Sequence, residues 1–312
     1  MDERWPDIPY PSWRDTCTAL HLYVQIVGKY RLARTPWINH AWQATFYPNA
    51  RGFTTGLVPD GAGGIELGFD LIGHQLVGTS TDGRTAYLPL GPMSVASFHS
   101  SFLQLICDLG GTPKLHGRPN EVPEPIRFSE DMVERPYDAD AVSRFFGAFV
   151  SASLALQKFR TSFLGKVSPV HFFWGSFDLA VTRFSSRPAP LHPGGIPALP
   201  DEITREAYSH EVSSAGFWPG GGGVDFPAFY SYAYPSPAGY ADAQIEPREA
   251  YFDETLGEFL LPYDKVRQAP DPEAALMAFL ESTYRAAADL AAWDVKSLEC
   301  ATGEPRRPRR LG

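Results

Sequence analysis

The chain has 312 residues, of which 44 % are hydrophobic and 13 % aromatic, enough apolar surface to build a large core without disulfides or metal ions. Acidic residues outnumber basic ones by 36 to 27, and the formal net charge of -9 at pH 7 argues against a protein that neutralises the phosphates of a nucleic acid. The three cysteines lack paired or metal-binding spacing, the N-terminus lacks a secretory signal, and the apolar runs are short for a bilayer span. We therefore expect a soluble cytoplasmic protein with reduced thiols and with neither a nucleic-acid nor a membrane partner.

The N-terminal part of the chain predicts a helix followed by an antiparallel meander. Apolar residues recur at helical spacing through residues 16–34, and Pro36 ends that segment. Alternating segments bounded by Asn, Gly and Pro follow, and the pair Asp82 and Gly83 is typical of a two-residue turn with positive φ angles. The predicted strands cover residues 43–47, 53–58, 65–71, 76–80 and 85–90.

Two capped amphipathic helices come next. Ser94 is a typical N-cap for an apolar stripe that extends to Gly110, a residue that can end a helix in the left-handed conformation. A proline-rich stretch, residues 113–136, leads to a second helix that Asp138 caps. The second helix is broadly apolar, so we expect it to lie centrally in the fold.

The C-terminal half repeats this order of strands first and a helix last. Residues 170–182 are expected to form one strand, and the prolines between residues 187 and 200 predict an extended loop. Asp271, followed by Pro272, marks the start of the last amphipathic helix. Further strands are predicted at residues 208–217, 228–234 and 258–261.

These elements predict an α+β protein in which amphipathic helices cover antiparallel β-sheets. Because both halves share one order of elements, one interpretation is a pair of related lobes, residues 1–136 and 137–300, with the candidate site in the second. The sequence contains no residue-level repeat to support a duplication, and a single continuous sheet is the alternative. Residues 301–312 carry four arginines among prolines and are expected to form a basic, disordered tail.

Several long stretches are rich in aromatic residues, histidine and glycine, above all residues 171–180, which read HFFWGSFDLA. The others are residues 20–21, 25–29, 36–42, 182–184, 192–195 and 206–220. In these stretches the chain resembles the bacterial family called domain of unknown function 5996, and the resemblance covers nearly the whole chain. Because that family carries no assigned activity, the resemblance implies kinship but neither a reaction nor a ligand.

Chemically useful side chains are densest between His171 and Glu211, among aromatic residues and glycines. Apolar walls with a few convergent polar groups are typical of small-molecule pockets. We therefore predict a cleft, lined by the strand from His171 to Asp178 and by residues 208–218, that binds a small organic molecule. Proton exchange between one imidazole and one carboxylate is the chemistry that such a cleft can support, and the candidate catalytic residues are His171, Asp178, His210 and Glu211.

The alternation of side chains along a strand restricts this hypothesis. In one regular strand over residues 170–180, His171 and Asp178 point to opposite faces. A bulge at Gly175 would re-aim the residues that follow it. His210 and Glu211 are sequence neighbours and are opposed in the same way.

Seven further residues are candidates for binding the ligand: His21, Lys29, His40, Trp174, Arg183, Tyr208 and Trp218. His21, Gln25 and Lys29 recur every four residues, so on a helix they form one polar ridge. This ridge either faces solvent or contributes to a cleft between the two lobes.

Other chemistries have weaker support. Imidazole and carboxylate groups suit zinc or iron, but the usual HxH, HxxxH and HExxH spacings are missing, so the sequence leaves metal and cofactor undetermined. The glycine run at residues 220–223 lacks the Lys-Ser/Thr pair of a phosphate loop, and Ser176 lacks the sequence context of a nucleophile elbow. The main alternative is a non-catalytic binding or structural module whose histidines are structural, and the oligomeric state is left undetermined as well.

Overall fold

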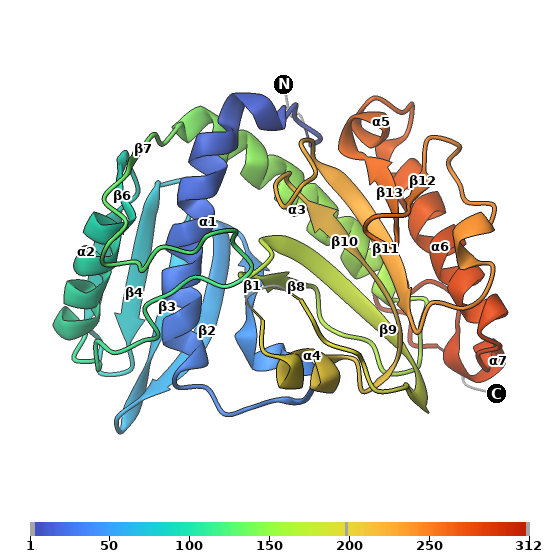
Figure 1. Ribbon diagram of the computed structural model, residues 1–312, viewed down its shortest axis with the longest axis horizontal. Coiled ribbons are helices and arrows are strands. Elements are labelled where there is room, and N and C mark those ends of the chain that lie inside the picture. The colour runs from blue at the N-terminus through green and yellow to red at the C-terminus, as the bar shows by residue number, and fades with distance from the viewer. Residues whose placement is uncertain (1–3, 197–198, 310–312) are drawn as a thin grey trace.

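One large sheet organises the protein. The computed structural model describes residues 4–196 and 199–309 (Figure 1). Within these residues, eleven strands form an open antiparallel sheet in the order β12-β13-β11-β10-β9-β8-β1-β2-β3-β4-β5. The predicted α+β class is confirmed.

The N-terminal strands form the predicted meander, in which each strand pairs with the next along the chain. The predicted two-residue turn is longer than expected, because Ser80 and Arg84 close a loop in which Gly83, but not Asp82, has a positive φ angle. The strands are β1 (Thr45–Asn49), β2 (Gly52–Asp60), β3 (Gly63–Asp70), β4 (Gln75–Ser80) and β5 (Thr85–Pro89).

The C-terminal strands continue the same sheet, and β10, β11 and β13 lie where strands were predicted. They are β8 (His171–Phe173), β9 (Asp178–Pro188), β10 (His210–Trp218), β11 (Ala228–Tyr234), β12 (Tyr251–Asp253) and β13 (Glu258–Pro262). A separate two-stranded sheet joins β6 (Met93–Ser94) to β7 (Glu134–Arg135).

The prediction of one strand over residues 170–182 is wrong, because this segment forms a hairpin. Phe173 pairs with Asp178, and residues 174–177 form the turn between β8 and β9. The side chains of Trp174 and Phe177 are buried, and the imidazole of His21 hydrogen-bonds the carbonyl oxygen of Gly175 over 2.8 Å. Contacts with residues distant in the sequence therefore stabilise a turn that the local sequence pattern does not predict.

Three of the helices begin at the predicted caps, since the side chains of Ser94, Asp138 and Asp271 accept hydrogen bonds from backbone amides in the first turn. The first helix starts six residues earlier than predicted, and α4 was not predicted at all. The helices are α1 (Tyr10–Leu32), α2 (Val95–Asp108), α3 (Ala139–Arg160), α4 (Asp201–Ala207), α5 (Tyr263–Arg267), α6 (Pro272–Leu290) and α7 (Val295–Leu298), with short 3-10 turns η1 (Asn39–Ala44) and η2 (Tyr240–Asp242).

The two faces of the C-terminal half of the sheet are covered differently. The long helices α3 and α6 pack against β9, β10 and β11, and α3 passes behind β10 in Figure 1. On the other face the short helix α4 packs against η1. By length and composition α3 is the one helix of the described residues that could cross a membrane, and more than half of its apolar stretch is buried inside the protein.

The strands of the two predicted lobes belong to one sheet, because β1 pairs with β8. Their division into related lobes remains a prediction. Within residues 301–309 of the predicted tail, Gly303 and Arg309 contact Thr161 at the end of α3, where the amide of Gly303 donates to the threonine hydroxyl. Arg310 and the last two residues lie outside the described part of the chain.

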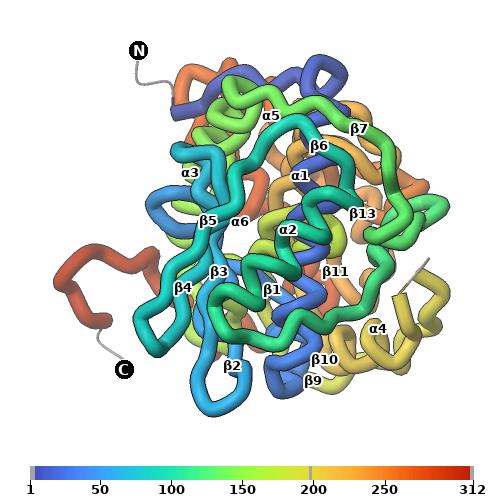
Figure 2. The backbone as a smooth tube through the Cα atoms, turned by 90° about the vertical axis from the view of Figure 1, so that its left-hand side faces the viewer, coloured from blue at the N-terminus to red at the C-terminus, as the bar shows by residue number. Residues whose placement is uncertain are grey.

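The connection between α2 and β7 is long and runs over the outside of α1 (Figures 1 and 2). It is anchored where Asn120 meets α1. The side-chain amide of Gln25 donates to the carbonyl oxygen of Asn120 over 2.8 Å, and the ammonium of Lys29 donates to Oδ1 of Asn120 over 2.5 Å. These contacts place Asn120 and Glu121 beside the turn between β8 and β9.

Candidate functional site

A cavity of about 250 Å³ lies on the face of the sheet that α3 and α6 do not cover. Because side chains alternate along a strand, every second residue of β9 points away from the core and toward this cavity. Leu179 and Val181, which lie between them, belong to the hydrophobic core. The floor consists of Phe173, Asp178, Ala180, Thr182, Phe184, Val212, Ser214, Tyr230 and Tyr232.

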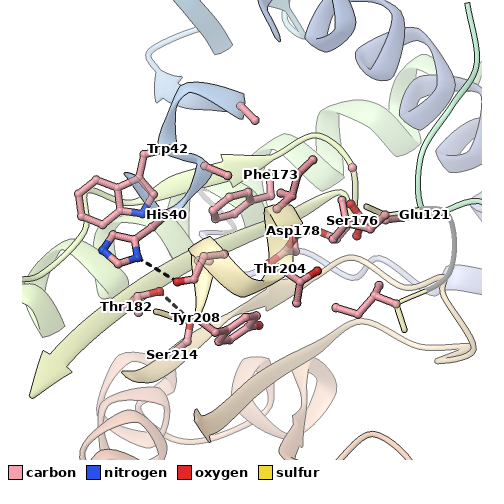
Figure 3. A pocket seen from close by; sticks show the side chains of 18 of the residues that line it. His40, Trp42, Glu121, Phe173, Ser176, Asp178, Thr182, Thr204, Tyr208 and Ser214 are labelled. Atoms are coloured by element: carbon pink, nitrogen blue, oxygen red, sulfur yellow. Dashed lines mark hydrogen bonds between the residues drawn. The ribbon is translucent and has the colours of Figure 1, made fainter. Parts of the chain in front are cut away.

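The opposite wall of the cavity is formed by η1 and α4 (Figure 3). The imidazole Nδ1 of His40 hydrogen-bonds the carbonyl oxygen of Ala207 over 2.9 Å, and the indole of Trp37 donates to the carboxylate of Glu206 over 3.1 Å. These two bonds hold α4 against η1. Thr204 of α4 lines the cavity, and its hydroxyl has no hydrogen-bond partner among the described residues.

Asp178 is the buried carboxylate of the floor, with 5 % of its surface exposed. It accepts hydrogen bonds from the hydroxyls of Ser176 and Tyr230. The side chain of Tyr230 on β11 crosses the middle strand β10 at Gly216 to reach Asp178 on β9. A Cβ added to Gly216 would lie only 2.4 Å from the hydroxyl oxygen of Tyr230. A glycine at this position therefore allows the bond between Tyr230 and Asp178 to form.

Two carboxylates lie at the same end of the cavity, where Figure 3 shows Glu121 and Ser176 next to Asp178. Burial raises the pKa of the Asp178 carboxyl to about 6. Glu121 is accessible to solvent but surrounded by protein, and desolvation followed by the charge of Asp178 raises its pKa to about 7. On β13, outside the cavity lining, burial and then the charge of Asp178 raise the pKa of Glu258 to about 8.

Tyrosine hydroxyls complete the polar lining of the cavity. The hydroxyls of Tyr208 and Tyr232 lie 2.9 Å apart, within hydrogen-bond distance. Burial raises the pKa of Tyr208 to about 12 and that of Tyr232 well above its ordinary value. Both groups are therefore neutral at physiological pH and serve as hydrogen-bond donors and acceptors.

Trp174 closes the cavity against α1. Gly28 provides the space for it, since an added Cβ would lie 2.4 Å from the indole ring. The ammonium of Lys29 lies 5.4 Å from the ring centroid, and burial lowers the pKa of this lysine to about 8. The polar ridge of His21, Gln25 and Lys29 thus faces the protein interior, so its interpretation as a solvated surface is wrong.

Comparison with known proteins identifies the family. A model described as a family of unknown function (DUF5996) matches residues 5–300, nearly the whole chain. The chain belongs to the DUF5996 family. Searches of curated proteins and of solved structures give no match. All residues that line the cavity lie within the range that the DUF5996 model matches.

Of the four candidate catalytic residues, Asp178 lines the cavity and the other three do not. The hairpin turns His171 to the same face as Asp178, but its ring is buried between Trp42 and Tyr47, at centroid distances of 5.3 and 5.6 Å. This burial lowers the pKa of His171 to about 3. The candidate imidazole and carboxylate are therefore not paired.

His210 and Glu211 separate as strand parity predicts. The ring of His210 lies 5.8 Å from that of His40, and Ser209 lies within hydrogen-bond distance of its Nδ1. Glu211 accepts a hydrogen bond of 2.7 Å from Arg187 and takes no part in the lining of the cavity. In this structure Glu211 therefore belongs to a surface ion pair.

The candidate ligand-binding residues divide into three groups. His40, Trp174 and Tyr208 line the cavity. His21 and Lys29 stand behind it and hold the Gly175 carbonyl and the Asn120 side chain. Arg183 and Trp218 lie elsewhere.

Arg183 points to the opposite face of the sheet, where it is 1 % exposed. It donates to the hydroxyl of Ser162 over 2.8 Å, and its guanidinium lies 3.5 Å from the centroid of Phe159. Trp218 packs against Tyr230 at 5.1 Å and does not line the cavity. Both residues therefore lie outside the cavity lining.

Several cavity residues lie outside the segments that the sequence analysis proposed for the cleft, namely Asn120, Glu121, Thr204, Tyr230 and Tyr232. The period-two spacing of Tyr230, Tyr232 and Tyr234 could have indicated an aromatic face on β11. Glu121 lies in a proline-rich connection whose path no local pattern reveals. In the described ranges, no three His, Cys, Asp or Glu side chains are grouped so as to hold a metal ion.

Proposed function

We propose that this protein binds a small organic molecule in the cavity between the sheet and α4. The observation that carries the proposal is an aromatic-walled cavity of about 250 Å³ with hydroxyl and carboxylate groups gathered at one end. Cavities of about 150 Å³ take up benzene, and ligand pockets commonly begin near 300 Å³. A compact molecule, with one ring and a short substituent, fits this volume.

Asp178 is the residue best suited to proton transfer with such a ligand. Its pKa of about 6 lies close to neutral pH, where a general acid or base works best. His40 is less suited, because Nδ1 is bonded to the Ala207 carbonyl and Nε2 lies 2.5 Å from the ammonium of Lys166. The proposal therefore assigns acid-base chemistry to a carboxylate and not to a histidine.

Binding without catalysis is the second candidate function. The histidines favour it, since His21 holds the turn between β8 and β9 and His171 is enclosed by aromatic rings. In this function Asp178 and the tyrosine hydroxyls orient the ligand without exchanging a proton.

A cavity-filling variant tests the proposal. Ser214→Phe places a ring in the cavity, while Ser101→Phe places the same ring on the exposed side of α2. We expect compact aromatic fragments to show saturation-transfer NMR signals with the wild type and with Ser101→Phe, and to lose them with Ser214→Phe. Equal signals from all three folded proteins, or no signal from the wild type, would contradict the proposal.

A further inference from the structure

The charges around the cavity are unbalanced. Among the described lining residues the charged side chains are Glu121 and Asp178, and no lysine or arginine accompanies them. Two cations lie near the cavity but do not line it. Lys29 donates to Asn120 and its charge acts on Glu121, and Lys166 lies against His40.

Asp178 shows this imbalance most clearly. The side chains that donate to it are the neutral hydroxyls of Ser176 and Tyr230, and no cationic group of the described residues is among the groups that shift its pKa. A buried carboxylate without a cation is costly, and the raised pKa of Asp178 reflects that cost. A cationic group of a ligand would supply the missing charge.

The walls of the cavity suit the rest of such a ligand. Tyr230 and Tyr232 present nearly parallel rings, 14° apart in plane, and Tyr208 lies against Tyr232. Phe173 and Trp174 add further rings to the lining. Aromatic faces attract organic cations through their quadrupoles, and they do so more strongly where water is excluded.

Thr204 is a further sign of a missing polar partner. Its side chain is 1 % exposed and lines the cavity, yet its hydroxyl has no hydrogen-bond partner in the described part of the chain. Buried hydroxyls are normally satisfied. A second polar atom on the ligand would satisfy this one.

We infer that the cavity recognises an organic cation, a compact amine whose ammonium group meets the carboxylates of Asp178 and Glu121 while its body packs against the tyrosine and tryptophan rings. This inference rests on the proposed function and names the chemical class of its ligand. The ammonium would favour ionised carboxylates, so the affinity should rise between pH 5 and pH 8. Two other carboxyl groups titrate beside Asp178, namely those of Glu121 and Glu258. The hydroxyls of Tyr208, Tyr230 and Tyr232 stay neutral in this pH range. The ammonium group of Lys29 faces Glu121.

Three probes of similar size and different charge test the inference. They are 2-phenylethylammonium, 2-phenylethanol and 3-phenylpropanoate, with affinities measured by titration calorimetry at pH 7.5. We expect the wild type to bind the ammonium at least about tenfold more tightly than the alcohol, with the carboxylate weakest. Asp178→Asn should remove this preference, whereas Asp242→Asn, a change at an exposed acid outside the cavity, should keep it.

Glu121→Gln keeps the test decisive if Asp178→Asn folds poorly, because Glu121 lies in an accessible connection and its replacement should also weaken the ammonium preference. Equal or tighter binding of the alcohol or the carboxylate, abolished by Ser214→Phe, would overturn the cation inference and leave the proposed function intact. An ammonium preference that survives both acid substitutions would also overturn it. Failure of all three probes and of the fragment set to bind the wild type would overturn both proposals.

Discussion

Asp178 is a carboxyl group that the folded protein holds in an apolar setting with two hydroxyl donors. Its pKa rises from 3.8 to about 6 on folding, so the folded state binds the proton more tightly than the unfolded state. The free energy of unfolding therefore falls as the pH rises from about 4 to about 6 and stays lower above that range. Glu121 and Glu258, whose pKa values are also raised, extend this decline toward pH 8.

The neutral isostere should relieve this penalty. We expect Asp178→Asn to increase the free energy of unfolding at pH 8 by about 2 kcal/mol and to change it little at pH 4. Urea denaturation at the two pH values measures the difference, and Asp242→Asn is the control for loss of an exposed charge. A loss of stability at pH 8 would show that the charged carboxylate is favourable in the fold.

At the scale of elements, the site depends on how β9, β10 and β11 lie together. Gly216 pairs with Ala180 of β9 and with Tyr230 of β11, and its missing side chain opens the path from Tyr230 to Asp178. A methyl group here would also press on the carbonyl oxygen of Leu179 at 2.0 Å. The three strands are thus built around a site that only glycine fits.

Gly216→Ala should therefore lower the free energy of unfolding by about 1 to 3 kcal/mol through overpacking. It should also displace the Tyr230 hydroxyl from Asp178, and the loss of this donated hydrogen bond would appear as a blue shift of tyrosine absorption in the difference spectrum. Gly91→Ala is the matched control, because an added Cβ there meets no atom within 4 Å. Identical stability of the two variants would contradict the packing argument.

Local patterns predicted the regular elements well. Alternation found the meander, and Ser94, Asp138 and Asp271 marked their helices, because strand and helix periods and caps are local properties. The turn at residues 174–177 was missed because contacts with α1 hold it. The helix α4 was missed because it follows a proline-rich stretch and has only seven residues.

At the scale of the whole molecule, one sheet separates a helix-covered face from a face that carries the cavity. Three residues that the sequence analysis proposed for the site, Asp178, Trp174 and Tyr208, line the cavity, and all lie among aromatic residues on or beside neighbouring strands. It could not place Glu121, because the position of this residue depends on the path of the long connection over α1. Arg183 donates to the carbonyl oxygen of Phe159 in α3, on the face of the sheet opposite the cavity, because side chains alternate along β9.

The same architecture explains why the sequence analysis proposed histidines for the site. His21, His40 and His171 occur beside the aromatic segments that build the cavity, and two of them hold its walls together through backbone carbonyls. The ring of His40 lines the cavity, whereas those of His21 and His171 do not. Of the two carboxylates predicted to be catalytic, Asp178 lines the cavity and Glu211 does not.

The most direct measurement is a crystal structure of the protein soaked with 2-phenylethylammonium. The account predicts density for the probe between the sheet and α4, with its nitrogen about 3 Å from a carboxylate oxygen of Asp178 or Glu121. A cavity that holds only water or has been filled by its own side chains, in crystals exposed to the probe at saturating concentration, would contradict it.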